Sequence, residues 1–179
     1  MSTLSKRIII CGTDTNVGKT IVSSFFVQGL KGIYWKPIQS GIEEDTDTQT
    51  VCKLLNLEPN RYLSERYKFK APVSPHWAAE KESRCIESNN LNLPDIDKLM
   101  IIETAGGLMV PLNRHWLQID QLQAWGAPII LVGRTGHGTL NHTLLSLEAL
   151  KKRNITVLGL VLNGPPHDDN PKTLEQFGN

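Results

Sequence analysis

The chain has 179 residues, of which 40% are hydrophobic and 21% are charged. This is the composition of a single globular domain, here residues 1–179, and not that of a disordered chain. Its 19 basic and 18 acidic side chains leave a formal net charge of +1, which gives no field to attract nucleic acid or an anionic membrane surface. Cys11, Cys52 and Cys85 are widely spaced, which predicts free thiols rather than a disulfide framework or a structural zinc site.

No targeting segment is evident in these residues. The apolar run at 8–11 is far too short for the core of a signal peptide, and no segment approaches the ~18 apolar residues of a membrane span. We therefore expect a cytoplasmic protein, or one that enters an organelle by a signal that these residues do not carry, with no membrane partner.

Short apolar runs alternate with helical patterns along the chain. In chain order the expected strands are 7–11, 33–35, a weaker piece at 67–69, 99–103, 129–133 and 156–163. Between them, apolar stripes at helical spacing predict two helices. The first covers 20–30, with Ile21, Val22, Phe25, Phe26 and Leu30, and the second covers 139–152, with Leu140, Leu144, Leu147 and Leu150.

These runs are continuously apolar rather than alternating, which is typical of parallel strands that are covered by helices on both faces. The sequence therefore predicts a doubly wound α/β fold with a mainly parallel sheet. Prolines divide residues 56–94 into short pieces, and apart from the weaker piece at 67–69 this stretch is left without a prediction.

The strongest motif is GTDTNVGKT at residues 12–20, between the first strand and the first helix. In such a loop successive backbone N–H groups and the positive end of the helix surround phosphate oxygens. Gly18 lets the backbone approach the phosphate, Lys19 would reach the β- and γ-phosphates, and Thr20 would bind Mg²⁺. The motif predicts a P-loop for ATP, although Thr13 stands where the first glycine usually lies.

Glu103 ends an expected buried strand. Ligands bind at the carboxyl ends of strands in open α/β sheets, so Glu103 is a candidate carboxylate for the metal. The alternative is a strand-end glutamate that faces solvent.

Six segments occur in order along the chain: GTDTNVGKT (12–20), YWKPIQSG (34–41), SPHWAA (74–79), ETAGGLMVPL (103–112), GTLNHTLLSLEAL (138–150) and GLVLNG (159–164). Together they resemble the dethiobiotin synthetases, and the resemblance covers nearly the whole chain. The resemblance implies a P-loop enzyme that closes a ring on 7,8-diaminononanoate with CO₂ and ATP. The reaction runs through a carbamate and its mixed anhydride with phosphate. Negative charge builds on oxygens throughout, so cations and N–H donors are needed more than a covalent nucleophile.

The resemblance also implies the roles of individual residues. Lys36 and Lys19 would be catalytic, with Lys36 between the carbamate and the γ-phosphate. The nucleotide site would comprise Asn16, Val17, Gly18, Lys19, Thr20, Ile21, Asp47, Glu103, Thr104, Ala105, Gly106, Asn163 and Gly164. Asn163 would read the adenine with its amide.

The metal and substrate residues follow from the same resemblance. Thr20, Asp47 and Glu103 would form the Mg²⁺ shell, and Asp45 is an alternative to Asp47. Thr15 and Ser40 would hold the amine or carbamate end of the substrate. Its carboxylate would bind at a helix N-terminus made by Gly138, Thr139, Leu140 and Asn141. A partner subunit would supply that helix, which implies a homodimer with active sites at the interface.

Three departures from the family pattern are visible. Thr104 replaces a glycine and is expected to place a side chain beside the phosphates, and the connection before the strand at 99–103 is shorter than the usual helix. The chain also reaches Asn179 soon after the last expected strand, where the family continues through another strand and a loop near the adenine. We therefore expect a C-terminally short fold with a nucleotide site that is more open to solvent.

Three rival interpretations remain. A partitioning-type switch ATPase would act as a binding and regulatory module, but it usually carries a second lysine early in the loop and lacks KPIQSG. A cobyrinate-type amidotransferase would need a glutaminase domain, for which there is no room. The third rival is a relative that binds ATP but has lost ring closure.

Overall fold

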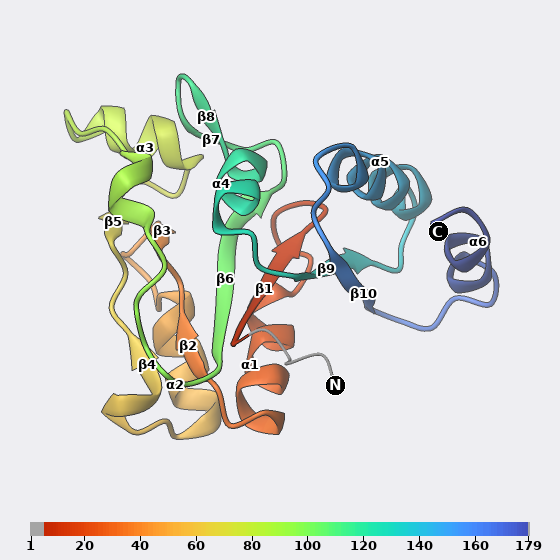
Figure 1. Ribbon diagram of the computed structural model, residues 1–179, viewed down its shortest axis with the longest axis horizontal. Helices are drawn as coiled ribbons and strands as arrows, with labels where there is room; N and C mark the ends of the chain where they lie inside the picture. Colours follow the sequence, from red (N-terminus) through yellow and green to blue (C-terminus); the bar gives the residue numbers. More distant parts are fainter. Residues whose placement is uncertain (1–5, 179) are drawn as a thin grey trace.

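A six-stranded sheet, parallel throughout, forms the centre of the computed structural model, which describes residues 6–178 (Figure 1). Its spatial order is β10-β9-β1-β6-β2-β4. The strands are β1 (Arg7–Gly12), β2 (Ile33–Trp35), β4 (Tyr62–Leu63), β6 (Met100–Gly107), β9 (Ile129–Arg134) and β10 (Val157–Asn163). The predicted doubly wound α/β class is confirmed, because the chain builds outward from β1 in both directions.

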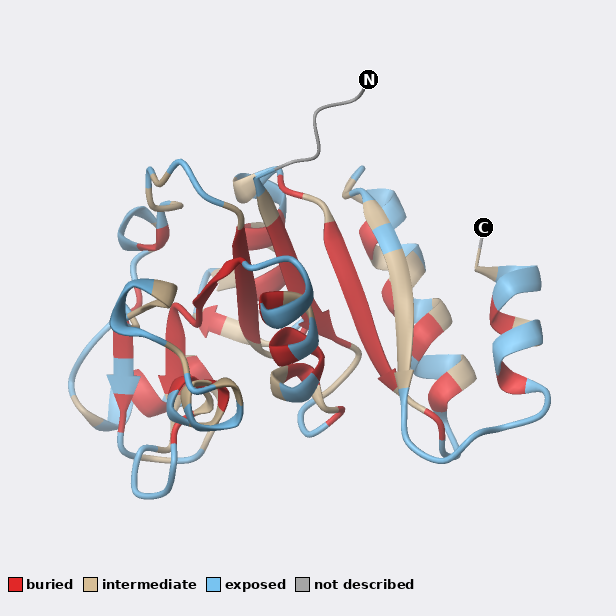
Figure 2. Ribbon diagram, turned by 90° about the horizontal axis from the view of Figure 1, so that it is seen from below, coloured by how far each residue is buried: buried red, intermediate tan, exposed pale blue. Residues whose placement is uncertain are grey.

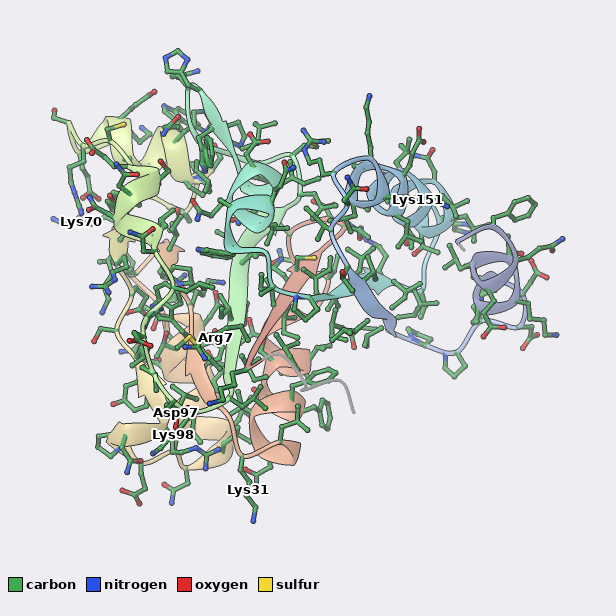
Figure 3. All side chains as sticks on the ribbon, in the orientation of Figure 1. Arg7, Lys31, Lys70, Asp97, Lys98 and Lys151 are labelled. Carbon is green, nitrogen blue, oxygen red and sulfur yellow. The ribbon has the colours of Figure 1, made fainter. Side chains whose placement is uncertain are left out.

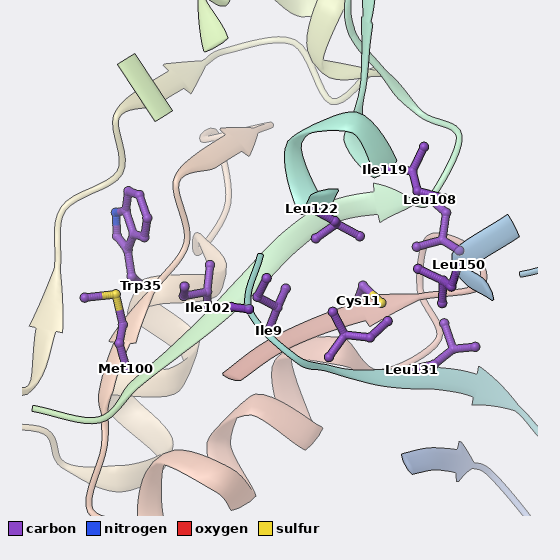
Figure 4. Packing of buried hydrophobic residues seen from close by; sticks show 12 residues of the cluster. Ile9, Cys11, Trp35, Met100, Ile102, Leu108, Ile119, Leu122, Leu131 and Leu150 are labelled. Atoms are coloured by element: carbon purple, nitrogen blue, oxygen red, sulfur yellow. The ribbon is translucent and has the colours of Figure 1, made fainter. Parts of the chain in front are cut away.

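Helices cover both faces of this sheet, and the alternation of side chains along β1 shows how. Ile8 and Ile10 pack with residues of α1 (Lys19–Gly29) and α2 (Asp47–Leu55). Ile9 and Cys11 point to the other face and pack with residues of α4 (Gln118–Trp125) and α5 (Thr139–Lys152), as Figure 4 shows. Successive strand residues thus serve two separate cores, which requires the continuous apolar run.

The remaining elements lie around this sheet. They are β3 (Ile38–Ser40), β5 (Tyr67–Phe69), β7 (Pro111–Asn113), β8 (Trp116–Leu117), α3 (Pro75–Lys81), α6 (Asn170–Phe177) and the 3₁₀ turns η1 (Pro59–Arg61) and η2 (Ser88–Leu91). The strand pair β3–β5 is parallel, and β7–β8 is antiparallel. A third core, with Phe69, Ala78 and Leu112, joins β5, α3 and β7. Within residues 56–94, the predicted extended piece at 67–69 is β5, and β4 joins the central sheet beside β2.

The C-terminal part is more open to solvent. α6 lies beside α5 at the β10 end of the sheet, and Figure 2 shows mostly exposed residues along it. β10 is only partly buried, whereas β9 and β1 are buried over most of their length (Figure 2). β10 has a hydrogen-bonded neighbour on one side alone among the described residues, which leaves it less covered than the central strands.

Helix α1 is rotated relative to the prediction. The structure buries Val22, Ser23 and Val27, while Ile21 and Phe25, which the expected stripe placed in the core, face outward with 44% and 72% of their surface exposed. The P-loop fixes where the helix begins and which side meets the sheet, so the small residues pack inward. The predicted orientation of this apolar stripe was therefore wrong.

The Arg7 side chain connects the amino-terminal end of β1 to the segment that precedes β6. The Arg7 guanidinium donates hydrogen bonds to the carbonyls of Pro94 at 2.8 Å, Ile96 at 2.9 Å and Lys98 at 3.1 Å. Figure 3 labels Arg7 and Lys98 in this part of the molecule. These bonds tie the segment before β6 to β1. Within residues 6–178, no helix has both the length and the apolar character needed to cross a membrane.

Candidate active site

The loop between β1 and α1 folds back on itself, and its glycines explain how. A Cβ on Gly12 would lie 2.8 Å from the Asp14 carbonyl oxygen and 2.9 Å from Val17 Cγ2. Gly18 has φ of +93°, in the left-handed region that favours glycine. The Lys19 ammonium curls over the loop and donates to the Asp14 carbonyl at 3.0 Å. The local sequence therefore builds a compact loop at the carboxyl end of β1.

A cavity of about 710 Å³ opens beside this loop. The predicted residues that line it are Thr15, Asn16, Gly18, Lys19, Thr20, Lys36, Ser40, Asp47, Glu103, Ala105 and Gly106. A larger hollow of about 910 Å³ lies between α5, β10 and α6, but none of the predicted site residues lines it, and its walls are largely aliphatic. We place the site at the loop, because charged groups converge there.

Lys36, Asp47, Glu103 and Thr20 form a connected cluster in the cavity. The Lys36 ammonium donates to Glu103 Oε1 at 3.0 Å and forms an ion pair with Asp47. Thr20 Oγ1 lies 2.9 Å from Asp47 Oδ1 and 2.9 Å from Glu103 Oε1, so its single proton serves one of them at a time. Lys36 and Glu103 are buried, so these charges interact with little screening by water.

The surroundings shift the pKa values of these groups. Burial alone would lower the pKa of Lys36, but the Glu103 and Asp47 carboxylates outweigh burial and raise it. Burial alone would raise the pKa of Asp47, but the Lys36 ammonium and the Thr20 hydroxyl lower it. Burial and the positive charge of Lys36 lower the pKa of Lys19. The cluster thus holds Lys36 as a cation and Asp47 as an anion.

Asp47 and Asp45 are separated by the start of α2. Asp47 is the first residue of that helix, its backbone N–H donates to Gln39 Oε1 at 3.2 Å, and its side chain lines the cavity. A capping box between Thr46 and Gln49 fixes the helix start. Asp45 instead forms an exposed ion pair with Lys53. Of the two alternatives, Asp47 is the one that the structure brings to the cluster.

The donor set fits a magnesium ion. Thr20, Asp47 and Glu103 offer one hydroxyl and two carboxylates, the hard oxygen ligands that Mg²⁺ prefers. Within the described residues no cluster of three or more His, Cys, Asp or Glu side chains could hold a metal by itself. Phosphate oxygens of a nucleotide would complete the shell, as is usual for Mg²⁺.

Several predicted nucleotide residues lie outside the cavity lining. Val17 is buried in the core under α1, and Ile21 is on the outward face of that helix. Thr104 is 1% exposed, and its hydroxyl has no hydrogen-bond partner among the described residues. Thr104 was expected to place its side chain beside the phosphates, but the structure buries this side chain outside the cavity, because neighbouring residues of β6 point to opposite faces of the sheet.

Asn163 and Gly164 lie at the end of β10, next to the loop. The Asn163 amide donates to the Val17 carbonyl at 3.1 Å, and a Cβ on Gly18 would meet that amide at 2.0 Å. A Cβ on Gly164 would lie 2.4 Å from Thr135 Oγ1. The structure thus places Asn163 against the backbone of the P-loop, beside the cavity rather than in its wall.

The predicted carboxylate site lies at the start of α5, also outside this cavity. Gly138 precedes the helix with φ of +83°, and no side chain caps the helix start. The Thr139 hydroxyl donates a hydrogen bond to the Arg134 carbonyl. The chain does not bring residues 138–141 into the cavity that Lys36 and Ser40 line.

Two neighbours of the cluster were missed by the sequence reasoning. Gln39 lines the cavity and accepts the Asp47 N–H. The Tyr34 hydroxyl donates to Glu103 Oε2 at 2.9 Å from a fully buried position. Both residues belong to the segment YWKPIQSG. Tyr34 is two residues from Lys36 and so shares its face of an extended chain, which was a signal that could have indicated it; Gln39 is three residues from Lys36, and this spacing gave no such signal.

Comparisons with known proteins agree with this geometry. A family model described as an AAA domain matches residues 6–179. The kinase domain of the Escherichia coli tyrosine kinase ETK superposes with a TM-score of 0.50 at 19% identity, over 92% of this chain and 69% of that chain. With the loop geometry, these findings define the class: an α/β nucleotide-binding domain of the P-loop type.

Closer relatives identify the family. The ATP-dependent dethiobiotin synthetase BioD of Rhodopseudomonas palustris (strain BisA53) is 43% identical over 175 residues, which cover 98% of this chain and 82% of the relative. The enzyme of the same name from Brucella anthropi is 44% identical, over 97% and 82%. The biotin biosynthesis bifunctional protein BioCD of Bordetella avium is 45% identical, over 97% of this chain and 37% of its own length. The chain belongs to the ATP-dependent dethiobiotin synthetase family.

Proposed function

We propose that the protein is an ATP-dependent ligase of biotin biosynthesis that closes a cyclic urea on 7,8-diaminononanoate with CO₂ to give dethiobiotin. One observation carries the proposal: beside a P-loop, a buried lysine contacts two carboxylates in one cavity, and a threonine hydroxyl lies next to both carboxylates. This arrangement suits transfer of a phosphoryl group to an anionic oxygen, because it concentrates fixed charges where negative charge develops.

The chemistry assigns a task to each side of the cavity. One amine adds CO₂ to form a carbamate, ATP transfers its γ-phosphoryl group to a carbamate oxygen, and the second amine then displaces phosphate as the ring closes. Lys36 would stabilise the charge that passes between carbamate and phosphate, and Lys19 would hold the phosphates. Ser40 Oγ is a buried atom in the cavity wall with no hydrogen-bond partner among the described residues. It would bind the carbamate or amine, with Thr15.

ATP would be the co-substrate and Mg²⁺ its counter-ion. Magnesium would neutralise phosphate charge and orient the phosphoryl group for transfer. Thr20, Asp47 and Glu103 would hold it, and Asn16, Gly18 and Gly106 would contact the nucleotide from the cavity wall. Asn163 would have to leave the Val17 carbonyl to read an adenine.

We also propose a homodimer. The residues at 138–141 do not line the cavity of their own chain, whereas a helix N-terminus from a partner could receive the substrate carboxylate. Exposed apolar side chains support a partner on this face. Met109 and Leu145 are 51% and 57% exposed around a hollow that also contains Thr13 and Asp14 of the P-loop. The single-domain organisation and a cytoplasmic location belong to the same proposal.

The deciding experiment is an assay with the diamine, bicarbonate and Mg-ATP, with dethiobiotin identified by mass spectrometry. We expect product, one ADP per product, and ATP turnover that depends on the diamine. ATP turnover that is independent of the diamine, with no product, would favour the partitioning-type switch ATPase and overturn the proposed function.

A further inference from the structure

Two donors at the end of β2 point at one carboxylate: Tyr34 lies in the strand, and Lys36 follows its last residue, Trp35. Tyr34 and Lys36 are two residues apart, so they share a face of the extended chain. The Tyr34 hydroxyl donates to Glu103 Oε2 at 2.9 Å, and the Lys36 ammonium donates to Glu103 Oε1 at 3.0 Å. Each oxygen of Glu103 therefore has its own partner from the same short segment, Tyr34 to Lys36.

The register of the sheet explains why the phenol reaches this carboxylate. Tyr34 of β2 lies opposite Ile101 of the parallel strand β6. Ile101 and Glu103 point to the same face, because they are two residues apart on that strand. The phenol thus extends one step along the face and ends at Glu103. A phenylalanine at this position would fill the same core volume without the hydroxyl.

The two oxygens of Glu103 face different environments. Oε1 lies 2.9 Å from the Thr20 hydroxyl and 3.0 Å from the Lys36 ammonium, both in the cavity wall. Oε2 is taken by Tyr34, which is fully buried and does not line the cavity. Without the phenol, Oε2 would be a buried acceptor that has lost this donor, and the carboxylate could rotate to share Lys36 between both oxygens.

We propose that Tyr34 is a positioning residue that divides the two oxygens of Glu103 between different tasks: the phenol holds Oε2, and Oε1 is left to face Thr20 and the magnesium ion. This inference rests on the magnesium site of the proposed function, but it requires only nucleotide and metal, not ring closure. Partners that hold a metal-binding carboxylate in place typically affect metal affinity about 10–100-fold.

The test measures Mn²⁺ binding by electron paramagnetic resonance, in the presence of a saturating non-hydrolysable ATP analogue. We expect Tyr34→Phe to raise the dissociation constant for Mn²⁺ about tenfold or more, while the affinity for the analogue in EDTA stays unchanged. A metal affinity equal to that of the wild type would overturn the inference. If the wild type failed to close the ring but Tyr34→Phe still weakened Mn²⁺ binding as expected, only the proposed function would be overturned.

Tyr67→Phe is the matched control. Tyr67 is also a buried tyrosine, and its hydroxyl accepts hydrogen bonds from the Glu87 N–H at 3.0 Å and the Asn90 amide at 3.1 Å. It does not line the cavity. We expect Tyr67→Phe to lower thermal stability without a change in Mn²⁺ affinity. Equal changes in Mn²⁺ affinity for the two variants would reduce Tyr34 to a packing role and overturn the inference.

A second measurement needs no substitution at Tyr34. The chain has three tyrosines, so protein labelled with 3-fluorotyrosine gives three ¹⁹F signals. Tyr62→Phe and Tyr67→Phe assign two of them, and the third belongs to Tyr34. With the ATP analogue present, added Mg²⁺ should shift the Tyr34 signal and leave the Tyr67 signal in place. A Tyr34 signal that does not respond to Mg²⁺ would contradict the proposal even if Tyr34→Phe fails to fold.

Discussion

At the scale of single residues, Lys36 links the two carboxylates of the cluster. It contacts Asp47 and Glu103 at once and is buried. A buried charge without a partner is costly, and removal of one member of a buried ion pair typically costs about 3–5 kcal/mol. Lys36 therefore stabilises the fold as well as preparing the site, and the two effects can be separated by experiment.

We predict that Lys36→Met lowers the rate of dethiobiotin formation about 100-fold or more, the effect typical of a lost charge-stabilising donor. Without magnesium the variant should also lose about 3 kcal/mol of unfolding free energy, because Asp47 and Glu103 then face each other without a cation. Mg-ADP should return more stability to the variant than to the wild type. Turnover assays and thermal unfolding with and without Mg-ADP measure these effects.

The contrast with the P-loop lysine is the control. Lys19→Met should weaken nucleotide binding in calorimetry, whereas Lys36→Met should still bind nucleotide. Lys53→Met, at an exposed ion pair with Asp45, should change neither. Normal turnover of Lys36→Met would remove this lysine from the mechanism.

Cys11 predicts a pH dependence of stability. Complete burial raises the pKa of its thiol from an ordinary 9.0 to about 12. Below pH 9 the thiol is protonated in the folded and unfolded chain alike, so Cys11 has no effect on the pH dependence. Between pH 9 and about 12 the unfolded chain releases the proton while the folded chain retains it, so the unfolding free energy falls as pH rises.

We predict that Cys11→Val removes this loss. At pH 10.5 the wild type should have lost about 2 kcal/mol through Cys11, at about 1.4 kcal/mol per pH unit above 9. Urea unfolding of both proteins at pH 8 and pH 10.5 measures the difference. Parallel decreases in the two proteins would show that Cys11 ionises freely in the folded state.

At the scale of elements, the sequence predicted the central strands well and the orientation of α1 badly. Runs such as residues 129–133 are apolar at every position, because both faces of the strand are covered, and the structure has a strand there. In α1 some apolar residues lie on the outer side, so the hydrophobic stripe predicted the wrong orientation. The P-loop, and not the hydrophobic stripe, sets which side of that helix meets the sheet.

The candidate site shows the same division between local and long-range information. The roles of loop residues such as Gly18 and Lys19 could be predicted from a local sequence motif. The contact between Asp47 and Lys36, and that between Tyr34 and Glu103, depends on strand register and on where α2 begins. Apart from the extended piece at 67–69, which is β5, residues 56–94 could not be assigned, because a short strand such as β4 is stabilised by pairing with a distant strand rather than by a local pattern.

The orientation of α1 leads to a prediction about stability. Val27 is fully buried and Phe25 is 72% exposed. We expect Val27→Ala to cost about 2 kcal/mol of unfolding free energy, from lost burial and the cavity that remains. Phe25→Gln should stay within about 0.5 kcal/mol of the wild type, as is usual on a surface. Chemical denaturation measures both. A larger loss of unfolding free energy for Phe25→Gln than for Val27→Ala would support the orientation of α1 that the sequence predicted.

At the scale of the whole molecule, the functional segments lie together at the carboxyl ends of the strands. The P-loop follows β1, Glu103 lies in β6, and Arg134 ends β9 before the start of α5. The Arg134 guanidinium forms an ion pair with Asp14 of the P-loop at 2.5 Å. The P-loop and the segment before α5 are therefore connected within one chain, but residues 138–141 still lie outside the cavity.

The proposed dimer predicts that two defective variants rescue each other. Lys36→Met damages the cavity of its own chain. Asn141→Asp places a negative charge in the first turn of α5, where it suits the helix but repels a substrate carboxylate. If a site combines the cavity of one subunit with α5 of the other, a mixed dimer contains one site with both defects and one with neither.

Random mixing of the two variants should then restore about a quarter of the wild-type activity, because half of the dimers are mixed and each has one intact site. The measurement is dethiobiotin formation at a low diamine concentration, after both variants are unfolded together and refolded. Each variant refolded alone is the control. Activity no greater than the average of the separate variants would show that the cavity and α5 do not combine across subunits, and a monomer in analytical ultracentrifugation would agree with that result.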